Sequence, residues 1–162
     1  MKVNQLKRVQ QLNTSIYEAW EFFSSPKNLK LITPDYLGFK ITSDLGDGKM
    51  YTGQIITYHV RPIAGIKLNW ATEITHVEKP YSFIDEQLAG PYKIWHHQHH
   101  FTENANGVLM EDIVTYALPW YSLGDISNKL IVRKKLEEIF NYRYEAAEKL
   151  FNKKNTSTPF LS

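Results

Sequence analysis

The sequence predicts an α+β fold in which a curved, seven-stranded antiparallel sheet wraps around a long C-terminal helix. Three observations favour this fold: a series of strand-like segments separated by short turns, two short helical segments after the first strand, and one long helical segment near the C-terminus. A sheet with one face covered by helices is a common two-layer design. If the sheet curls around its helix, space remains between them for a cavity.

The long helix is predicted over residues 123–153, because no Gly or Pro interrupts the chain from Asp125 to Ser157. Its apolar residues recur every three or four positions, which places them on one stripe facing a core. This stripe consists of Val132, Leu136, Ile139, Phe140, Ala147, Leu150 and Phe151. Arg143 lies beside the stripe, so it either pairs with a carboxylate at the rim of the sheet or grips an acidic ligand at the mouth of a pocket.

The sequence of the N-terminal part predicts one strand followed by two short helices. Residues 2–12 alternate in polarity, as a strand does. Ser15 and Glu18 have the spacing of a capping box at the start of a helix over residues 16–24. Ser25 before a proline then predicts a second capped helix, over residues 26–32.

Six further strands are predicted, and turn residues separate them. Their ranges are 38–44, 50–60, 66–77, 81–89, 92–102 and 108–118. Strands joined by such short connections pair with their neighbours as an antiparallel meander. With the strand over residues 2–12, the predicted sheet has seven strands.

Length and composition predict a single domain over residues 1–154 and a frayed tail over residues 155–162. The formal charge of +2 gives no strong field for nucleic acid. The chain has no cysteine, which excludes disulfides and thiol catalysis, and no apolar run approaches the roughly 20 residues of a membrane span. The N-terminus lacks the apolar stretch of a signal peptide. We therefore expect a cytoplasmic protein, a monomer or weak homodimer, with no nucleic-acid partner and no integral membrane segment.

A histidine-rich segment over residues 95–101 carries most of the chemical information. Side chains alternate between the two faces of a strand, and the large aromatic residues indicate that their own face looks inward. That face holds Trp95, His97, His99 and Phe101. An even-length hairpin loop would add Asp112 to the same face, opposite His99 or Phe101. His97, His99 and Asp112 then converge in an otherwise apolar interior, and they are the candidate catalytic residues.

Three interpretations of this group remain open. In the first, it is a satisfied buried network in which Asp112 fixes the tautomer of a histidine. In the second, it orients the polar part of a ligand in a mostly apolar pocket. In the third, the two histidines and the carboxylate hold a metal ion, since they are suitable ligand types. Because two histidines at i and i+2 are common on strands, we expect neither a metal ion nor a cofactor.

Segments spread over roughly residues 1–152 resemble one protein family in order and spacing. The most specific are the pattern F-x-D-x-Q-x-x-G-P-[FY] over residues 83–92 and the pattern W-x-H-x-H-x-F over residues 95–101. The chain is therefore similar to bacterial ligand-binding members of the START-like superfamily, also called SRPBCC or birch-pollen-allergen-like, which have the helix-grip fold. The resemblance implies a hydrophobic cavity between sheet and helix, entered near the two short helices. Relatives bind or carry lipids, sterols, polyketides, quinones and hormones, and some are cyclases or dehydratases.

We expect the residues that match these patterns, together with nearby aromatic residues, to line this cavity. The predicted ligand-binding residues are Trp70, Asp85, Gln87, Trp95, His97, His99, Phe101, Asp112, Tyr116, Phe140 and Arg143. Periodicity does not decide which face of residues 81–89 points inward, so Asp85 and Gln87 are included on the resemblance. The patterns fix no catalytic role, because a fold does not determine function.

The first hypothesis is that the protein binds a small hydrophobic molecule of lipid, polyketide or aromatic type in this cavity. The alternative is a cyclase-, dehydratase- or hydrolase-like enzyme in which His97 or His99 acts as general acid or base, oriented by Asp112. A second alternative is a protein-interaction or co-chaperone-like module, which would need an exposed apolar patch of about a few hundred Å². Binding is favoured over catalysis because no phosphate loop, nucleophile elbow or metalloprotease motif is present.

Overall fold

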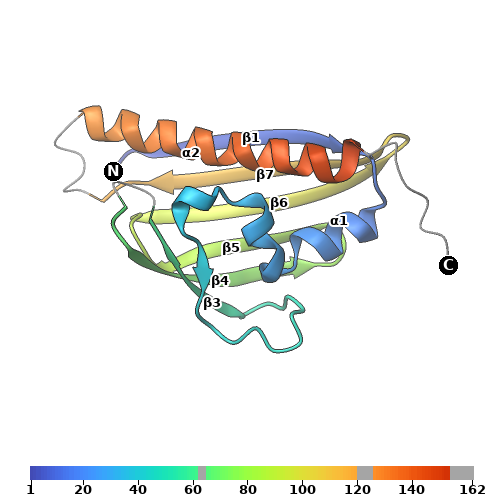
Figure 1. Ribbon diagram of the computed structural model, residues 1–162, viewed down its shortest axis with the longest axis horizontal. Helices are drawn as coiled ribbons and strands as arrows, with labels where there is room; N and C mark the ends of the chain where they lie inside the picture. The colour runs from blue at the N-terminus through green and yellow to red at the C-terminus, as the bar shows by residue number, and fades with distance from the viewer. Residues whose placement is uncertain (62–64, 120–125, 154–162) are drawn as a thin grey trace.

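The computed structural model describes residues 1–61, 65–119 and 126–153, and helices lie against one face of its sheet (Figure 1). In chain order the elements are β1 (Val3–Leu12), α1 (Ile16–Phe23), η1 (Pro26–Ile32), η2 (Asp35–Leu37), β2 (Lys40–Ile41), β3 (Ile55–Val60), β4 (Leu68–Glu78), β5 (Ser82–Ala89), β6 (Ile94–Asn104), β7 (Gly107–Ala117), α2 (Ile126–Ala147) and η4 (Glu148–Asn152). The tail predicted over residues 155–162 and the first predicted residues of the long helix, 123–125, lie outside the described residues.

The sheet has seven strands in the order β1-β7-β6-β5-β4-β3-β2, and every adjacent pair is antiparallel. The six later strands form the predicted meander, and β1 joins the sheet by pairing with β7. The helix α2 runs along β1 and β7, while α1 contacts β6 and β7 near one end of the sheet (Figure 1). The prediction of an α+β fold with a curved sheet and a long C-terminal helix is confirmed.

The helix α1 begins at the predicted residue for the predicted reason. The Ser15 side chain accepts a hydrogen bond from the Glu18 backbone amide, and the Glu18 carboxylate accepts one from the Ser15 amide. The following helix η1 also covers the predicted range, but it is a 3₁₀ helix and the Ser25 side chain does not cap it. Ser25 nevertheless occupies the N-cap position, with proline in the first turn, as predicted.

Two predicted strands are much shorter in the structure. β2 contains only Lys40–Ile41 instead of residues 38–44, and β3 begins at Ile55 instead of residue 50. The chain between them turns at Gly46, Gly48 and Gly53, which all have positive φ angles that favour glycine and interrupt extended backbone. The other strands agree with the prediction to within two residues at either end.

The long helix buries or half-buries its predicted stripe, with one exception. Leu136, Phe140 and Ala147 are buried, but Leu150 is 48% exposed. The last turn, Glu148–Asn152, is a π-helix. A wider turn changes the angle between successive side chains, so the α-helical spacing no longer places Leu150 inward.

The interior holds two apolar clusters on either side of a polar centre. The first core cluster lies beside α1 and contains Leu12, Ile16, Ala19, Trp20, Phe23, Ile32, Phe83, Phe101, Val108, Met110 and Ala147. The second core cluster lies under α2 and contains Val114, Tyr116, Leu136 and Phe140. Among the described residues, no helix is long and apolar enough to cross a membrane.

Candidate functional site

A pocket of about 170 Å³ lies between the sheet, η1 and α2. Aromatic side chains from several strands form much of its wall. Trp70 is central to that wall, with its ring 5.3 Å from Trp95, 5.5 Å from Tyr92 and 5.8 Å from Tyr58. From the helix side, Leu136, Ile139 and Phe140 complete the enclosure.

Four ionisable side chains meet on the wall of this pocket, and we call them the Asp–His cluster: Asp85, His97, His99 and Asp112. The hairpin between β6 and β7 has a two-residue loop, because Asn104 pairs with Gly107. This even length places Asp112 on the predicted face and opposite His99, one of the two positions expected for it. On the other side of β6, Asp85 pairs with His97. Strand register alone therefore brings two carboxylates to two histidines.

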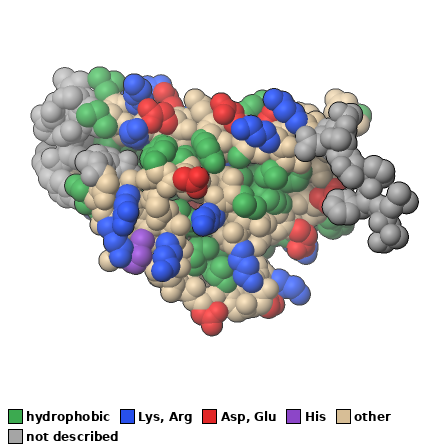
Figure 2. Space-filling model, in the orientation of Figure 1, with side chains coloured by type: hydrophobic (Ala, Val, Ile, Leu, Met, Phe, Trp, Pro, Cys, Tyr) green, Lys and Arg blue, Asp and Glu red, His purple; other side chains and the backbone are tan. Residues whose placement is uncertain are grey.

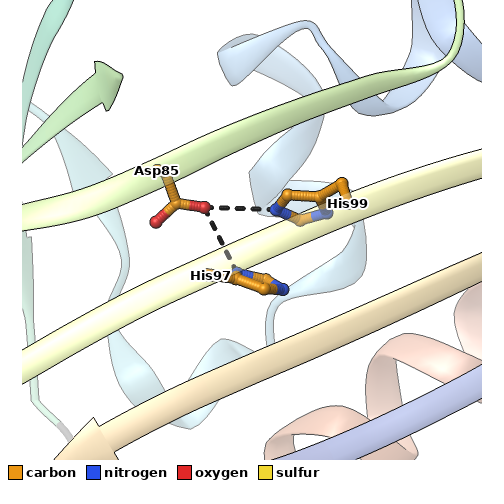
Figure 3. Close-up of side chains that lie close together, drawn as sticks. All are labelled: Asp85, His97 and His99. Atoms are coloured by element: carbon orange, nitrogen blue, oxygen red, sulfur yellow. Dashed lines mark hydrogen bonds and ion pairs between the residues drawn. The ribbon is translucent and has the colours of Figure 1, made fainter. Parts of the chain in front are cut away.

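Every ring nitrogen in the Asp–His cluster lies near a carboxylate oxygen. Asp85 Oδ2 is 3.2 Å from His97 Nδ1 and 3.1 Å from His99 Nε2 (Figure 3). Asp112 Oδ1 is 2.8 Å from His99 Nδ1 and 3.4 Å from His97 Nε2. The two imidazole centroids are 3.8 Å apart. His97, His99 and Asp112 are buried, and Asp85 is partly buried.

The contacts on the Asp112 side are short but poorly directed. Three buried atoms of the Asp–His cluster have no partner with hydrogen-bond geometry among the described residues: His97 Nε2, His99 Nδ1 and Asp112 Oδ1. The contact on the Asp85 side is better, since His99 Nε2 and Asp85 Oδ2 are hydrogen bonded. Buried polar atoms are usually paired, so the unpaired atoms indicate a centre whose polar groups are not fully satisfied by the described residues.

Charge and burial act against each other in this cluster. Burial alone would raise the pKa of Asp85, but the charge of His97 and hydrogen bonds from both histidines outweigh it and lower that pKa. Burial alone would also raise the pKa of Asp112, but the charge of His99 and the contacts with both histidines outweigh it and lower that pKa. Burial alone would lower the pKa of His97, but the charge of Asp85 and the contacts with Asp112 raise it. Both carboxylates are therefore ionised at neutral pH, and His97 holds a proton more tightly than an ordinary histidine.

Arg143 adds a guanidinium group to the pocket wall. Its guanidinium carbon is 5.2 Å from the centre of the Phe140 ring, and its Nε is buried without a hydrogen-bond partner among the described residues. No described carboxylate lies within ion-pair distance of it. Arg143 was expected either to pair with a carboxylate at the rim of the sheet or to grip an acidic ligand. The described residues offer no partner for the first role.

Most residues predicted from the sequence as ligand-binding line the pocket. These are Trp70, Asp85, Trp95, His97, His99, Asp112, Phe140 and Arg143. Gln87, Phe101 and Tyr116 do not line it. The Gln87 amide holds the Tyr92 backbone through two hydrogen bonds of 2.7 and 3.1 Å. Phe101 packs in the first core cluster and Tyr116 in the second.

Sequence reasoning missed Tyr58 and Tyr92, which both line the pocket. Burial raises the pKa of both tyrosines, so both remain neutral hydroxyls. The Tyr58 hydroxyl is 3.1 Å from the Thr72 hydroxyl. Alternation of Ile56, Tyr58 and Val60 along β3 would have revealed the inward position of Tyr58.

No family model matches the chain, and no curated protein matches it. Solved structures do match. CV1439 from Chromobacterium violaceum superposes with a TM-score of 0.69 at 12% identity, covering 93% of this chain and 99% of that one. Ms6760 from Mycobacterium smegmatis superposes with a TM-score of 0.63 at 15% identity, covering 93% of this chain and 96% of that one. Ara h 8.0201 superposes with a TM-score of 0.59 at 11% identity, covering 91% of this chain and 99% of that one.

The chain has the helix-grip fold. The three similar structures agree with it over nearly their whole lengths, so the likeness includes the sheet and the long helix. Identities this low show the fold alone and transfer neither ligand nor activity.

Proposed function

We propose that the protein binds a small, mainly apolar ligand in the pocket between its sheet and α2. The observation that carries this proposal is a pocket walled by aromatic residues, with a buried Asp–His cluster and the unpaired Nε of Arg143 on its wall. Small-molecule sites combine an apolar lining with a few convergent polar groups. The motifs over residues 83–101 also support membership of the bacterial ligand-binding START-like subfamily.

The pocket size narrows the class of ligand. An apolar cavity of roughly 150 Å³ in a protein core is large enough to hold a benzene molecule. A pocket of about 170 Å³ therefore suits a ligand of one aromatic ring better than a sterol or a long acyl chain. The faces of Trp70, Tyr92 and Trp95 would pack against such a ring.

The polar groups on the wall favour a ligand with one acidic or hydroxyl group. Arg143 would pair with a carboxylate or phenolate, because the described residues offer its Nε no hydrogen-bond acceptor. The Tyr58 hydroxyl, also on the wall, would donate or accept a further hydrogen bond. We therefore propose a monocyclic aromatic acid or phenol as the preferred ligand.

The experiment is a thermal-shift screen with a size series of ligands. The series contains single-ring aromatic acids and phenols, two-ring acids, and long-chain fatty acids. Ligands that bind the folded state raise the melting temperature, and we expect the single-ring members to raise it most. If no member of the series raises it, the proposal fails.

A matched pair of variants tests whether binding uses this pocket. Ile139 lines the pocket from α2, whereas Ile131 lies on the same helix but is 48% exposed and outside the lining. Ile139→Trp should fill the pocket and abolish the thermal shift, and Ile131→Trp should preserve it. Equal shifts in both variants would contradict binding at this site.

The geometry favours binding over general acid–base catalysis. Each ring nitrogen of His97 and His99 already lies within 3.4 Å of a carboxylate oxygen. A substrate would reach a ring nitrogen only by displacing one of these carboxylates, and a general base must reach the proton that it removes. The cyclase-like alternative would therefore need the cluster to rearrange.

An interaction module has less support. The exposed large apolar residues are distributed over many elements, for example Val3, Tyr36, Ile55, Leu88 and Ile131. In Figure 2, hydrophobic side chains on the visible face are interspersed with charged ones. A docking surface for a protein would more typically be one contiguous apolar patch.

A further inference from the structure

We propose that Asp85, His97 and His99 bind a divalent first-row transition-metal ion, with Asp112 holding the two histidine rings from the opposite side. The candidate ligand atoms of the three residues all lie within 4.8 Å of one another. Figure 3 shows Asp85 directed toward both rings from the neighbouring strand. This proposal concerns an ion, and it does not depend on the organic ligand proposed above.

The distances around Asp85 match those of a coordination shell. Asp85 Oδ2 is 3.2 Å from His97 Nδ1 and 3.1 Å from His99 Nε2. Two ligand atoms that each bind a tetrahedral ion at about 2.0–2.1 Å lie about 3.3 Å from each other. The side chains therefore need only a small outward shift to admit an ion between them.

Asp112 supplies the outer support that metal-bound histidines require. A histidine that binds a metal through one ring nitrogen usually donates the other N–H to a carboxylate or carbonyl. The second nitrogens, His97 Nε2 and His99 Nδ1, both face Asp112 Oδ1, at 3.4 and 2.8 Å. These three buried atoms have no directed hydrogen bond in the described structure. An ion on the Asp85 side would fix the ring orientations and turn both N–H groups toward Asp112.

The charge of the cluster also suits a divalent ion. The buried carboxylate of Asp112 and the partly buried one of Asp85 need compensation, because uncompensated buried charge is costly. One divalent cation with two neutral imidazoles gives the cluster zero net charge. The Trp95 indole N–H donates a 3.3 Å hydrogen bond to Asp85 Oδ1. The rings packed on the histidines are apolar: the Phe83 ring stacks 4.0 Å from His99, and the Phe140 ring lies 5.5 Å from His97.

The donor set decides the kind of ion. Magnesium and calcium prefer shells made of oxygen atoms, whereas imidazole nitrogens suit zinc, iron, nickel and copper. Three protein ligands leave at least one coordination position open, which is the pattern of metal sites that also hold a small molecule. All three residues line the pocket, so the open position would face the pocket interior.

The test is calorimetric titration of the EDTA-stripped, dialysed wild-type protein with Zn²⁺ alone. We expect one ion per chain, and at least about a hundredfold weaker binding in Asp85→Asn and in His99→Gln. The matched control is His96→Gln, since His96 lies on the same strand but the opposite face, where it pairs with Glu86 at 2.6 Å. That control should bind Zn²⁺ as tightly as the wild type.

Asp112→Asn separates the supporting role from direct ligation, because loss of an outer carboxylate typically weakens metal binding by about 10–100-fold without abolishing it. Near-UV circular dichroism verifies that each variant is folded. If a variant fails to fold, paramagnetically shifted ring protons of His97 and His99 in the Co²⁺-loaded wild type identify the ligands instead. The proposal is overturned if the wild type takes up no Zn²⁺, if His96→Gln loses the ion, or if Co²⁺ leaves both histidine rings unshifted.

Discussion

The first core cluster and the Asp–His cluster share the strand β6 but have opposite characters, and we call these two parts of the interior the apolar end and the polar end. Along β6, the inward residues in order are Trp95, His97, His99 and Phe101. Phe101 packs against Trp20 and Phe83 in the first core cluster, with ring centroids 6.2 and 6.3 Å away. Two positions earlier, His99 faces two carboxylates beside a pocket.

The comparison shows that strand alternation decides which face a side chain occupies, whereas neighbouring strands decide what it does there. A buried phenylalanine gains stability simply from contact and removal from water. A buried histidine loses its hydration and gains stability only from the partners that surround it. We therefore infer that one end of the interior stabilises the fold, while the other end is arranged for an occupant.

The largest expected effect is at the apolar end. Phe101 is 2% exposed, so Phe101→Ala should lower the free energy of unfolding by about 3–5 kcal/mol. Urea denaturation measures this loss. Affinity for Zn²⁺ in the folded fraction should stay at the wild-type value. A loss below about 1 kcal/mol would contradict the assignment of this end as the stabilising core.

A second pair of variants sharpens the contrast at the polar end. Asp112→Ala leaves buried imidazoles without one of their two carboxylates. It should lower the free energy of unfolding of the ion-free protein by about 3–5 kcal/mol. Replacing the entire Asp–His cluster by leucine should be neutral or stabilising by about 1–4 kcal/mol, because no charge is then buried. Urea denaturation compares the two, and Zn²⁺ uptake should be lost in the fourfold variant. If that variant is as unstable as Asp112→Ala, the cluster is a structural requirement of the fold.

The pH dependence of stability separates the two ends further. The pKa of His97 is raised in the folded protein by Asp85 and Asp112, so its contribution is fully present below its unfolded pKa of about 6.5 and is lost as the pH rises through the folded pKa. The pKa values of Asp85 and Asp112 are lowered, so their contribution is present above about pH 4 and is lost as the pH falls toward the folded values.

We therefore expect the EDTA-treated protein to be most stable between about pH 4 and 6.5 and to lose stability above that range. Urea midpoints across the pH range measure this. His97→Gln should remove the decline on the alkaline side, and His96→Gln should leave it in place. An alkaline decline of equal size in both variants would exclude His97 as its source.

The smallest expected effect lies outside both regions, at the start of α1. Ser15→Ala removes the side-chain acceptor of the capping box and should lower the free energy of unfolding by about 1 kcal/mol. Neither ligand binding nor Zn²⁺ uptake should change, because Ser15 is not part of the pocket wall. Chemical denaturation with a parallel thermal-shift assay checks both statements.

Local sequence signals were sufficient to predict most of the fold. Polarity alternation, turn residues and the Ser15–Glu18 pair were enough for the strands and α1, because each depends on nearby residues. The errors came where local rules did not apply: glycine turns shortened β2 and β3, and a π-helical turn rotated Leu150 outward. Neither feature has a reliable periodic pattern.

The candidate site was only half predictable for a related reason. His97, His99 and Asp112 lie on one hairpin, so loop length and alternation were enough to bring them together. The approach of Asp85 depends on the register between β5 and β6, and the polarity of residues 81–89 does not determine that register. Tyr58 belongs to a strand two positions further across the sheet. Only the three-dimensional pairing reveals that His97 and His99 each face carboxylates on both sides.

Native mass spectrometry of the purified protein tests most directly whether the polar end of the interior is built for an occupant. The wild-type protein and Ile131→Trp, each incubated with a single-ring aromatic acid, should carry a bound ligand mass that disappears on denaturation. Ile139→Trp should show the mass of the chain without that ligand. If the wild type never carries a bound small molecule, or if Ile139→Trp carries it equally well, the pocket is not the binding site.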